Sequence, residues 1–221
     1  MMRFALAALC ATLLTTGAHA ATITSSKSSF LANVSGVVTE TTSFGLPYFD
    51  GAGNPTVINA VTLTDGAVLS GLTNNNPVLA GSSFAPLSSG YSGDLAYNSG
   101  TSETLSFDNW VQAIGFTFAP DLGIAAQLGL PNNASVTFAL SNGQSMTDSL
   151  NSFDAGDSLF FGATNLKPGT TLTITVSGTD GFGNPIAGFA IGDILDVPEP
   201  ASVALLGMAA AGMAFARRKR A

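Results

Sequence analysis

The body of the chain alternates apolar and polar residues over short stretches. Four stretches place an apolar or aromatic side chain at nearly every second position: 110–118, 136–140, 172–176 and 187–191. Successive side chains of a strand point to opposite faces, so a period of two predicts strands with one face in a core. The segments between these stretches lack helical periodicity. One short helix is predicted earlier, around 28–34, ended by Gly36.

Glycine-containing turns separate the predicted strands. Asp65-Gly66 and Asn142-Gly143 each lie between two apolar stretches, which is the strongest short-range signal of a β-hairpin. Lys167-Pro168-Gly169-Thr170 predicts a further turn that leads into the next strand. Roughly eight to ten short strands at this spacing predict an all-β fold, an antiparallel β-sandwich.

Residues 1–20 have the three parts of a signal peptide. Met1-Met2-Arg3 is a positively charged start, residues 4–14 are apolar, and Ala18-His19-Ala20 has the small-x-small pattern of a cleavage site. The apolar part is shorter than the ~20 residues that span a bilayer. We therefore expect export from a bacterial-type cell and cleavage after Ala20, with Ala18 and Ala20 in the small-residue positions.

The C-terminal segment also has three parts in a fixed order. Pro198-Glu199-Pro200 comes first, an apolar stretch over 201–216 follows, and the chain closes on Arg217-Arg218-Lys219-Arg220. The apolar stretch predicts a helix about 24 Å long at ~1.5 Å per residue, somewhat short of a ~30 Å hydrocarbon core. Because basic residues stay on the cytoplasmic side, we expect one transmembrane helix with the body outside. An ordinary single-pass anchor would have the same helix and basic cluster.

The order of Pro-Glu-Pro motif, short helix and terminal basic cluster resembles the PEP-CTERM sorting signal. The resemblance implies recognition by an exosortase, a membrane enzyme that processes the tail and passes the protein to the cell surface or the extracellular matrix. It indicates where the protein is delivered and not what it does, because such tags occur on many unrelated domains. The expected organisation is a signal peptide (1–20), a β-sandwich domain (21–196) and a sorting signal (197–221), with the chain in the inner membrane before processing.

The body itself resembles the jelly-roll domains often found ahead of this tag. The resemblance rests on Ala113-Ile114-Gly115-Phe116, on Phe160-Phe161-Gly162 and on the last strand, Phe189-Ala190-Ile191-Gly192-Asp193-Ile194. It implies a jelly-roll-like sandwich. The last strand is also similar to that of carbohydrate-binding jelly rolls, in which an acid there often helps to hold a structural calcium. Here Gly192 replaces the first of the two Asp residues.

The charge of the body limits its partners. Between the two ends, Lys27 and Lys167 stand against thirteen acidic residues, which gives a formal charge of −11. Nucleic-acid binding needs Lys and Arg to displace counterions, so it is excluded. Adhesion to anionic lipid is disfavoured for the same reason. Solubility and divalent cations fit the acidic balance.

Little catalytic chemistry remains after export. The only cysteine, Cys10, and the only histidine, His19, leave with the signal peptide. The mature chain therefore has no disulfide, no thiolate nucleophile, no His base for a triad and no zinc site of the usual kinds. Thirteen acids leave a carboxylate pair open in principle, but most of them adjoin Gly, Asn or Ser, as solvated turn residues do. We expect no catalytic residues and no enzyme activity.

One loop occurs twice and is the main metal candidate. Asp50-Gly51-Ala52-Gly53-Asn54-Pro55 recurs as Asp180-Gly181-Phe182-Gly183-Asn184-Pro185. Asp and Asn oxygens on such loops can bind Ca²⁺, which makes Asp50, Asp180 and the last-strand Asp193 weak candidates. Neither copy has the remaining oxygens of an EF-hand loop, so two strand-joining turns are the main prediction. No cofactor is expected, with calcium as the alternative.

Two functions remain open. The first is a structural or adhesive protein of the envelope, the biofilm or the extracellular matrix, and the second is a carbohydrate-binding module for exopolysaccharide. Exposed aromatic rings in a flat strip would favour the second, whereas a sheet face of Ser, Thr and Asn would favour the first. Tyr48, Tyr91 and Tyr97 lie in polar loop sequences and are the candidates for exposed contact, although each could also pack over a sheet end. Trp110 is expected in the core.

Overall fold

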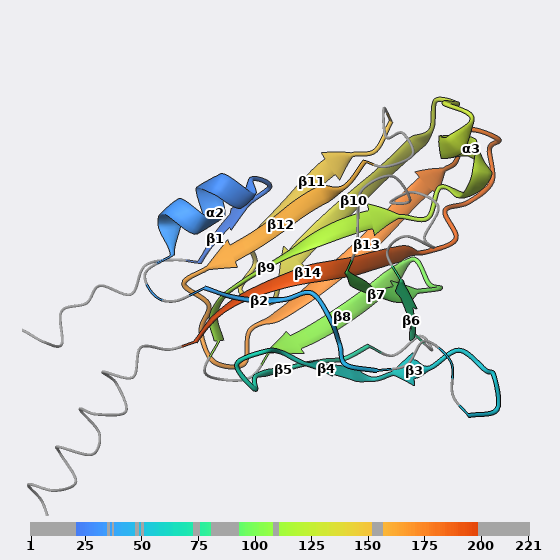
Figure 1. Cartoon of the computed structure of the whole chain (residues 1–221). Coiled ribbons are helices and arrows are strands. Elements are labelled where there is room, and N and C mark those ends of the chain that lie inside the picture. The colour runs from blue at the N-terminus through green and yellow to red at the C-terminus, as the bar shows by residue number, and fades with distance from the viewer. Residues whose placement is uncertain are drawn as a thin grey trace, which may run out of the picture.

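The computed structural model describes residues 21–34, 36, 38–46, 49, 51–72, 76–80, 93–107, 111–151 and 157–198, and for 76–80 it describes the backbone alone. Within these residues an eight-stranded and a six-stranded sheet lie face to face (Figure 1). Apolar side chains fill the space between them. All strand pairs within the two sheets are antiparallel. The predicted all-β antiparallel sandwich is confirmed.

The eight-stranded sheet has the order β1-β12-β9-β14-β7-β6-β3, and β2 also pairs with β14. Its strands are β1 (Thr22–Thr24), β2 (Thr39–Thr41), β3 (Val57–Ile58), β6 (Asn76–Ala80), β7 (Asp94–Asn98), β9 (Val111–Pro120), β12 (Leu159–Thr164) and β14 (Phe189–Pro198). The six-stranded sheet has the order β11-β10-β13-β8-β5-β4. Its strands are β4 (Ala60–Thr62), β5 (Val68–Ser70), β8 (Ser102–Phe107), β10 (Asn133–Leu140), β11 (Ser145–Ser149) and β13 (Thr171–Thr179).

Five phenylalanines form the centre of the core. They are Phe116 and Phe118 of β9, Phe138 of β10, Phe161 of β12 and Phe189 of β14. Phe138 stacks on Phe161 with ring centroids 4.7 Å apart and meets Phe118 edge to face at 5.3 Å. Such ring pairs add about 0.5–1.5 kcal/mol each beyond the burial of their area. Because Phe138 belongs to the six-stranded sheet and the other four to the eight-stranded one, these contacts join the two sheets.

The predicted turns are present. Asp65-Gly66 connects β4 to β5, and Asn142-Gly143 connects β10 to β11. The turn after β12 is closed by a hydrogen bond from the Thr170 N–H to the Lys167 carbonyl oxygen (3.0 Å). Gly169 in this turn has φ +78°, a left-handed conformation that glycine adopts without steric cost.

One predicted face differs from the structure. Ile114 points into the core as expected, but Gln112 does not continue that face, and Val111 is the buried core residue instead. The register of β9 against β14 shifts between Val197 and Pro198, so Gln112 is the extra residue of a β-bulge. A bulge reverses the alternation of side chains beyond it, which a strict period of two does not predict.

The predicted short helix is α2 (Lys27–Asn33), which begins after Ser26 and covers part of the outer face of the eight-stranded sheet. The Ser26 hydroxyl accepts a hydrogen bond from the Ser29 N–H (3.2 Å), as an N-cap residue does. The fully buried Phe30 packs with Leu195 and Val197 of β14. A second helix, α3 (Gly123–Gln127), was not expected. Figure 1 places α3 at one end of the sandwich and the C-terminal end of β14 at the other.

The two glycines of the motifs that suggested a jelly-roll body lie opposite each other beneath α2. Gly115 of β9 pairs with Gly162 of β12. An added Cβ at Gly115 would lie 2.6 Å from the Phe160 ring, and one at Gly162 would lie 2.7 Å from the Phe30 ring. The two glycines therefore leave the space in which these rings lie over the sheet. The jelly-roll-like description of the strand order stays a prediction.

This packing gives a first testable expectation. Gly162→Ala should lower the free energy of unfolding by about 1–3 kcal/mol, because its Cβ forces Phe30 and Phe160 to move. Urea unfolding of the purified protein measures the difference. Gly51→Ala is the matched control, since a Cβ there meets nothing within 4 Å and the change should stay within about 0.5 kcal/mol. Equal midpoints for the two variants would contradict the packing.

Candidate functional site

The last strand runs directly into the predicted sorting signal. β14 ends at Pro198, the first residue of the Pro-Glu-Pro motif, and Pro198 still lies opposite Val111 of β9. Proline fits the end of a strand because it has no N–H to place in the ladder. The sandwich therefore continues beyond the predicted domain boundary at Asp196.

Asp196 of β14 is a buried acid close to this junction. Its side chain is 0% exposed and lies on the same strand face as the core residue Ile194. Neither carboxyl oxygen has a hydrogen-bond donor among the described residues. A second carboxyl, that of Asp65 on the turn between β4 and β5, lies close to it. Two carboxyls can share a hydrogen bond only through a proton, so a protonated pair would link the two sheets here.

The surroundings of Asp196 favour its neutral form. Burial, followed by the hydrogen bond with Asp65 and the negative charge of Asp65, raises the pKa of Asp196 from 3.8 to about 7. The Asp65 carboxyl also accepts a hydrogen bond from the Ala67 N–H (2.8 Å), which holds it on its turn. The last strand thus carries, two residues before Pro198, a carboxyl whose pKa is raised toward neutrality.

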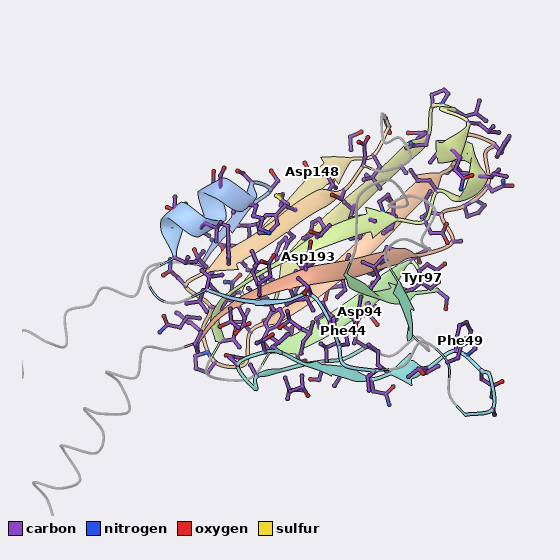
Figure 2. The ribbon with its side chains drawn as sticks, in the orientation of Figure 1. Phe44, Phe49, Asp94, Tyr97, Asp148 and Asp193 are labelled. Atoms are coloured by element: carbon purple, nitrogen blue, oxygen red, sulfur yellow. The ribbon has the colours of Figure 1, made fainter. Side chains whose placement is uncertain are left out.

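Asp193, the predicted last-strand metal candidate, lies at a second β-bulge. Its φ is +45°, and the register of β14 against β9 shifts between Gly192 and Leu195. At the same place β14 exchanges one neighbour, β7, for another, β2. Figure 2 shows Asp193 near the middle of the sheet. Throughout the described ranges, no group of three or more His, Cys, Asp or Glu side chains could hold a metal ion.

The repeated Asp-Gly-x-Gly-Asn-Pro loop makes similar turns at both places. Gly53 has φ +81° and Gly183 has φ +83°. Each loop is closed by an isolated antiparallel bridge between the residue before its Asp and its Pro. Asp50 itself lies outside the described residues. The shared geometry fits the prediction of two strand-joining turns.

The carboxylate of Asp180 is used within its own turn. One oxygen accepts hydrogen bonds from the N–H groups of Phe182 (2.9 Å) and Asn184 (2.8 Å), and the other accepts one from the Asn184 side-chain amide (3.1 Å). Desolvation raises the pKa of Asp180, but these hydrogen bonds outweigh it and hold the pKa below 3.8. Both oxygens thus stabilise the turn.

The outer face of the six-stranded sheet is covered by hydroxyl groups. On β8, β10, β11 and β13, nearly every side chain that alternates with a core residue is Ser or Thr. We call this set the hydroxyl face: Ser102, Thr104, Ser106, Ser135, Thr137, Ser145, Thr147, Ser149, Thr171, Thr173, Thr175, Ser177 and Thr179. Neighbouring strands lie roughly 4.8 Å apart and alternate residues about 6.7 Å apart, so the hydroxyls form a regular array.

Hydrogen bonds between strands order this array. The Thr104 and Thr173 hydroxyls lie 2.9 Å apart, and those of Thr137 and Thr147 also lie 2.9 Å apart. Two further hydroxyl pairs, one between β8 and β13 and one between β10 and β13, have distances of 3.2 and 3.0 Å. Cross-strand Thr and Ser pairs of this kind stabilise a sheet modestly and fix side-chain rotamers.

Charge is kept off the hydroxyl face. The four strands that form it contain two acids, Glu103 and Asp148, and both occupy positions that alternate with the hydroxyls. Glu103 is 3% exposed, on the same strand face as the core residue Leu105. In a body with a charge of −11, the sheet thus presents a neutral surface over four strands.

Tyr97, predicted in a loop, lies in strand β7 instead. It is half-buried, and its hydroxyl donates a hydrogen bond to Asp121 (2.6 Å). Burial, then the hydrogen bond and charge of Asp121, raise the pKa of Tyr97 above its ordinary value of 10. Asp94, from the same strand, lies beside Phe44 in Figure 2, and its carboxylate accepts a hydrogen bond from the Phe44 N–H (2.6 Å). The Tyr97 side chain therefore links β7 to the segment that follows β9, and the expectation of a loop tyrosine was wrong.

Comparison with known families identifies the C-terminal segment. The family model described as PEP-CTERM protein-sorting motif matches residues 196–220. The chain carries a PEP-CTERM sorting motif. The match begins at Asp196, so the first residues of the PEP-CTERM motif belong to strand β14 of the folded body. The comparison with curated proteins found no match.

Solved structures with a similar arrangement include carbohydrate-binding modules and also carbohydrate-active enzymes. TmCBM61 in complex with beta-1,4-galactotriose is 14% identical, with a TM-score of 0.32, over 60% of this chain and 88% of that one. The CBM22-1 xylan-binding domain of Paenibacillus barcinonensis Xyn10C is 13% identical, with a TM-score of 0.29, over 75% and 95%. CBM35 of Cellvibrio japonicus Abf62 is 13% identical, with a TM-score of 0.28, over 61% and 99%. Likeness at this distance does not indicate what the chain binds.

Several predicted features lie outside the described residues. They are the signal peptide with Ala18 and Ala20, Tyr48, Tyr91, Trp110, Glu199, Pro200, the apolar stretch 201–216 and the basic cluster Arg217-Arg218-Lys219-Arg220. Among the residues that the structure does describe, no helix is long and apolar enough to cross a membrane. The signal peptide and the transmembrane helix stay predictions.

Sequence reasoning missed the Asp65–Asp196 pair and the hydroxyl face. The pair joins residues far apart in the sequence, and no local pattern signals it. The hydroxyl face does have a signal, since Thr171, Thr173, Thr175, Ser177 and Thr179 follow one another at every second position. This polar alternation marks the outward set of the same strands whose inward set is apolar.

The raised pKa of Asp196 predicts a pH dependence of stability. Between the unfolded pKa near 4 and the folded pKa of about 7, the folded protein binds more protons than the unfolded chain. The protonated form of Asp196 therefore contributes its full share to the free energy of unfolding below about pH 4. This contribution is lost as the pH rises to about 7, by up to ~4 kcal/mol. Urea unfolding from pH 4 to pH 8 measures this slope. Asp196→Asn keeps the size and hydrogen-bonding capacity but should flatten it, and parallel profiles would contradict the assignment.

Proposed function

We propose that the protein is exported, sorted through its PEP-CTERM motif and held in the extracellular matrix as a structural or adhesive component. The motif supports the address, because PEP-CTERM tails are processed by an exosortase-type membrane enzyme that passes the body to the surface. Before processing, the 201–216 helix would hold the chain in the inner membrane. No catalytic role is proposed.

The observation that carries the matrix role is the hydroxyl face. Its four strands place Ser and Thr at regular intervals and turn their two acids inward, which suits contact with a neutral, hydroxyl-rich polymer such as exopolysaccharide. Each hydroxyl contact replaces a hydrogen bond to water by a hydrogen bond to the polymer and gains only about 0.5–1.5 kcal/mol. Strong retention therefore needs many contacts with one extended polymer at the same time.

A carbohydrate-binding module for soluble saccharides is the alternative. Such a module would be expected to stack sugar rings on a strip of exposed aromatic side chains. Within the described residues the exposed aromatics are Phe49 (62%) and Phe182 (53%), which lie on separate loops. Neither lies on the hydroxyl face. The arrangement favours the structural role over a module for short, soluble sugars.

One fractionation experiment tests sorting and retention together. Wild-type protein should occur in the matrix fraction about 2 kDa smaller than its membrane precursor, having lost the segment after Pro-Glu-Pro. Changing Pro198, Glu199 and Pro200 to Ala leaves the apolar stretch and basic cluster intact, so the variant should insert but accumulate uncleaved in the membrane. Normal processing of this variant would mean that the motif acts only as a helix boundary.

The second arm tests the hydroxyl face. Thr104→Lys with Thr175→Lys adds two charges to exposed positions of the face. This variant should be processed normally but released into the medium, because each ammonium must be desolvated against a neutral polymer. Leu31→Lys with Asn33→Lys adds the same charge on α2, on the opposite side, and should stay in the matrix. Equal retention of both double variants would exclude the face as the contact surface.

A further inference from the structure

Strand β11 forms an open edge of the six-stranded sheet. It stands last in the strand order, beyond β10, and no further strand pairs with it among the described residues. β1 lies close to it but pairs with β12. Figure 1 shows β11 along one side of the sandwich and β3 and β4 along the other. Those three end strands have two or three residues each, whereas β11 has five, so β11 is the longest edge available for pairing.

The outward backbone groups of β11 belong to its odd-numbered residues. The Leu150 N–H donates a hydrogen bond to the Ala134 carbonyl oxygen (2.8 Å), and the Leu140 N–H donates one to the Gln144 carbonyl oxygen (2.8 Å). The even-numbered positions of this segment therefore face β10. Hydrogen-bonding direction alternates along a strand, so the N–H and C=O groups of the odd-numbered positions face away from β10. These positions are Ser145, Thr147 and Ser149.

β11 lacks the usual protection of an edge strand. Exposed edges commonly carry Lys, Pro or a bulge, and β11 has none of these. Its one charged residue, Asp148, lies on the inward side of the strand, where one of its carboxyl oxygens is already buried. Like charges directly opposite each other destabilise a strand pair. Asp148 therefore disfavours particular registers and leaves the edge itself open.

One antiparallel register of β11 with a second copy of β11 uses all the outward groups. In this register Thr147 lies opposite Thr147 of the second copy, and Ser145 lies opposite Ser149 of the second copy. Three residue pairs then exchange both of their N–H···O bonds, which gives about six backbone hydrogen bonds. Asp148 lies opposite Met146 of the second copy. A register centred on Asp148 would instead place two carboxylates opposite each other.

From these features we propose that a second copy of this chain pairs with β11 in the register centred on Thr147, so that the two six-stranded sheets form one continuous sheet. One row of hydroxyls crosses four strands in register, and pairing continues it into the same row of the second copy. Its members are Ser102, Thr175, Thr137 and Thr147. The pair thus presents a hydroxyl face of twice the width. The association uses backbone groups of the edge, so the inference goes beyond the proposed function and does not rest on it.

Sedimentation equilibrium of the protein purified from its host tests the association. Stable interfaces bury about 1,200–2,000 Å² in total, and a five-residue edge offers less, so association should increase with concentration. Between about 10 µM and about 1 mM the average mass should rise toward that of two chains. A constant mass of one chain over this range would overturn the proposal. Growth beyond two copies would contradict a closed two-fold pair.

Two substitutions at Thr147 test the edge. Thr147→Pro removes an outward N–H and keeps the bonds to β10, because proline is tolerated on an edge strand where its N–H faces solvent. It should weaken association about tenfold or more, whereas the matched control Thr147→Ala keeps the N–H and should associate like wild type. Ser145→Lys with Ser149→Lys places Lys opposite Lys and should weaken association even if the proline variant fails to fold. Association of this lysine variant like that of wild type would overturn the proposal.

Single cysteines test the register, in a Cys10→Ala background that removes the one native cysteine. With oxidised glutathione, Thr147→Cys should form a disulfide-linked pair, because its two Cα atoms would lie about 5.5 Å apart. Ser145→Cys should not, since its counterpart would lie about 13 Å away along the strand. Equal cross-linking of both would overturn the register. The Thr104→Lys and Thr175→Lys variant should associate normally, so failure of the β11 edge and failure of the hydroxyl face are distinguishable.

Discussion

The layer of phenylalanine rings between the two sheets is the constraint on which the rest of the structure depends. Phe138 contacts rings from the opposite sheet at 4.7–6.1 Å, so neither sheet can slip by one residue without turning its core side chains outward. Side chains alternate with a period of two, and the inward set therefore determines the outward set. The hydroxyl face follows directly from the packing of the core.

The two outer surfaces of the sandwich are used differently. The eight-stranded sheet carries α2, and Gly115 and Gly162 leave room for Phe160 and Phe30 to cover its backbone. The six-stranded sheet has no such cover among the described residues and presents hydroxyl groups instead. This asymmetry supports the proposal that the hydroxyl face contacts the surroundings of the protein, whereas the covered face contributes to the stability of the body.

Much of the fold could be predicted from the sequence because its signals are local. Alternation around Phe138 and Ile174, and the Asp65-Gly66 and Asn142-Gly143 turns, are properties of neighbouring residues. The two bulges on β9 and β14 could not be predicted, since a bulge depends on the partner strand.

The candidate site divides in the same way. The PEP-CTERM motif was found because it is contiguous, and the family match confirms it. The Asp65–Asp196 pair joins two segments far apart in the sequence, so it requires the three-dimensional structure. Gln112 and Tyr97 show which positions the local sequence cannot predict. The orientation of Gln112 depends on how β9 pairs with β14, and the position of Tyr97 depends on its contact with Asp121.

Protection of the hydroxyl face within the intact matrix is the most direct test of the account. The one cysteine, Cys10, lies in the predicted signal peptide, so once that peptide is removed Thr175→Cys and Leu31→Cys each introduce a unique label site, one on the hydroxyl face and one on α2. A membrane-impermeant maleimide is applied to intact matrix and to extracted protein, and the labelled fractions are compared. We predict that Thr175→Cys is protected in the matrix and reactive after extraction, while Leu31→Cys reacts in both. Equal labelling at the two sites in intact matrix would contradict a contact through the hydroxyl face.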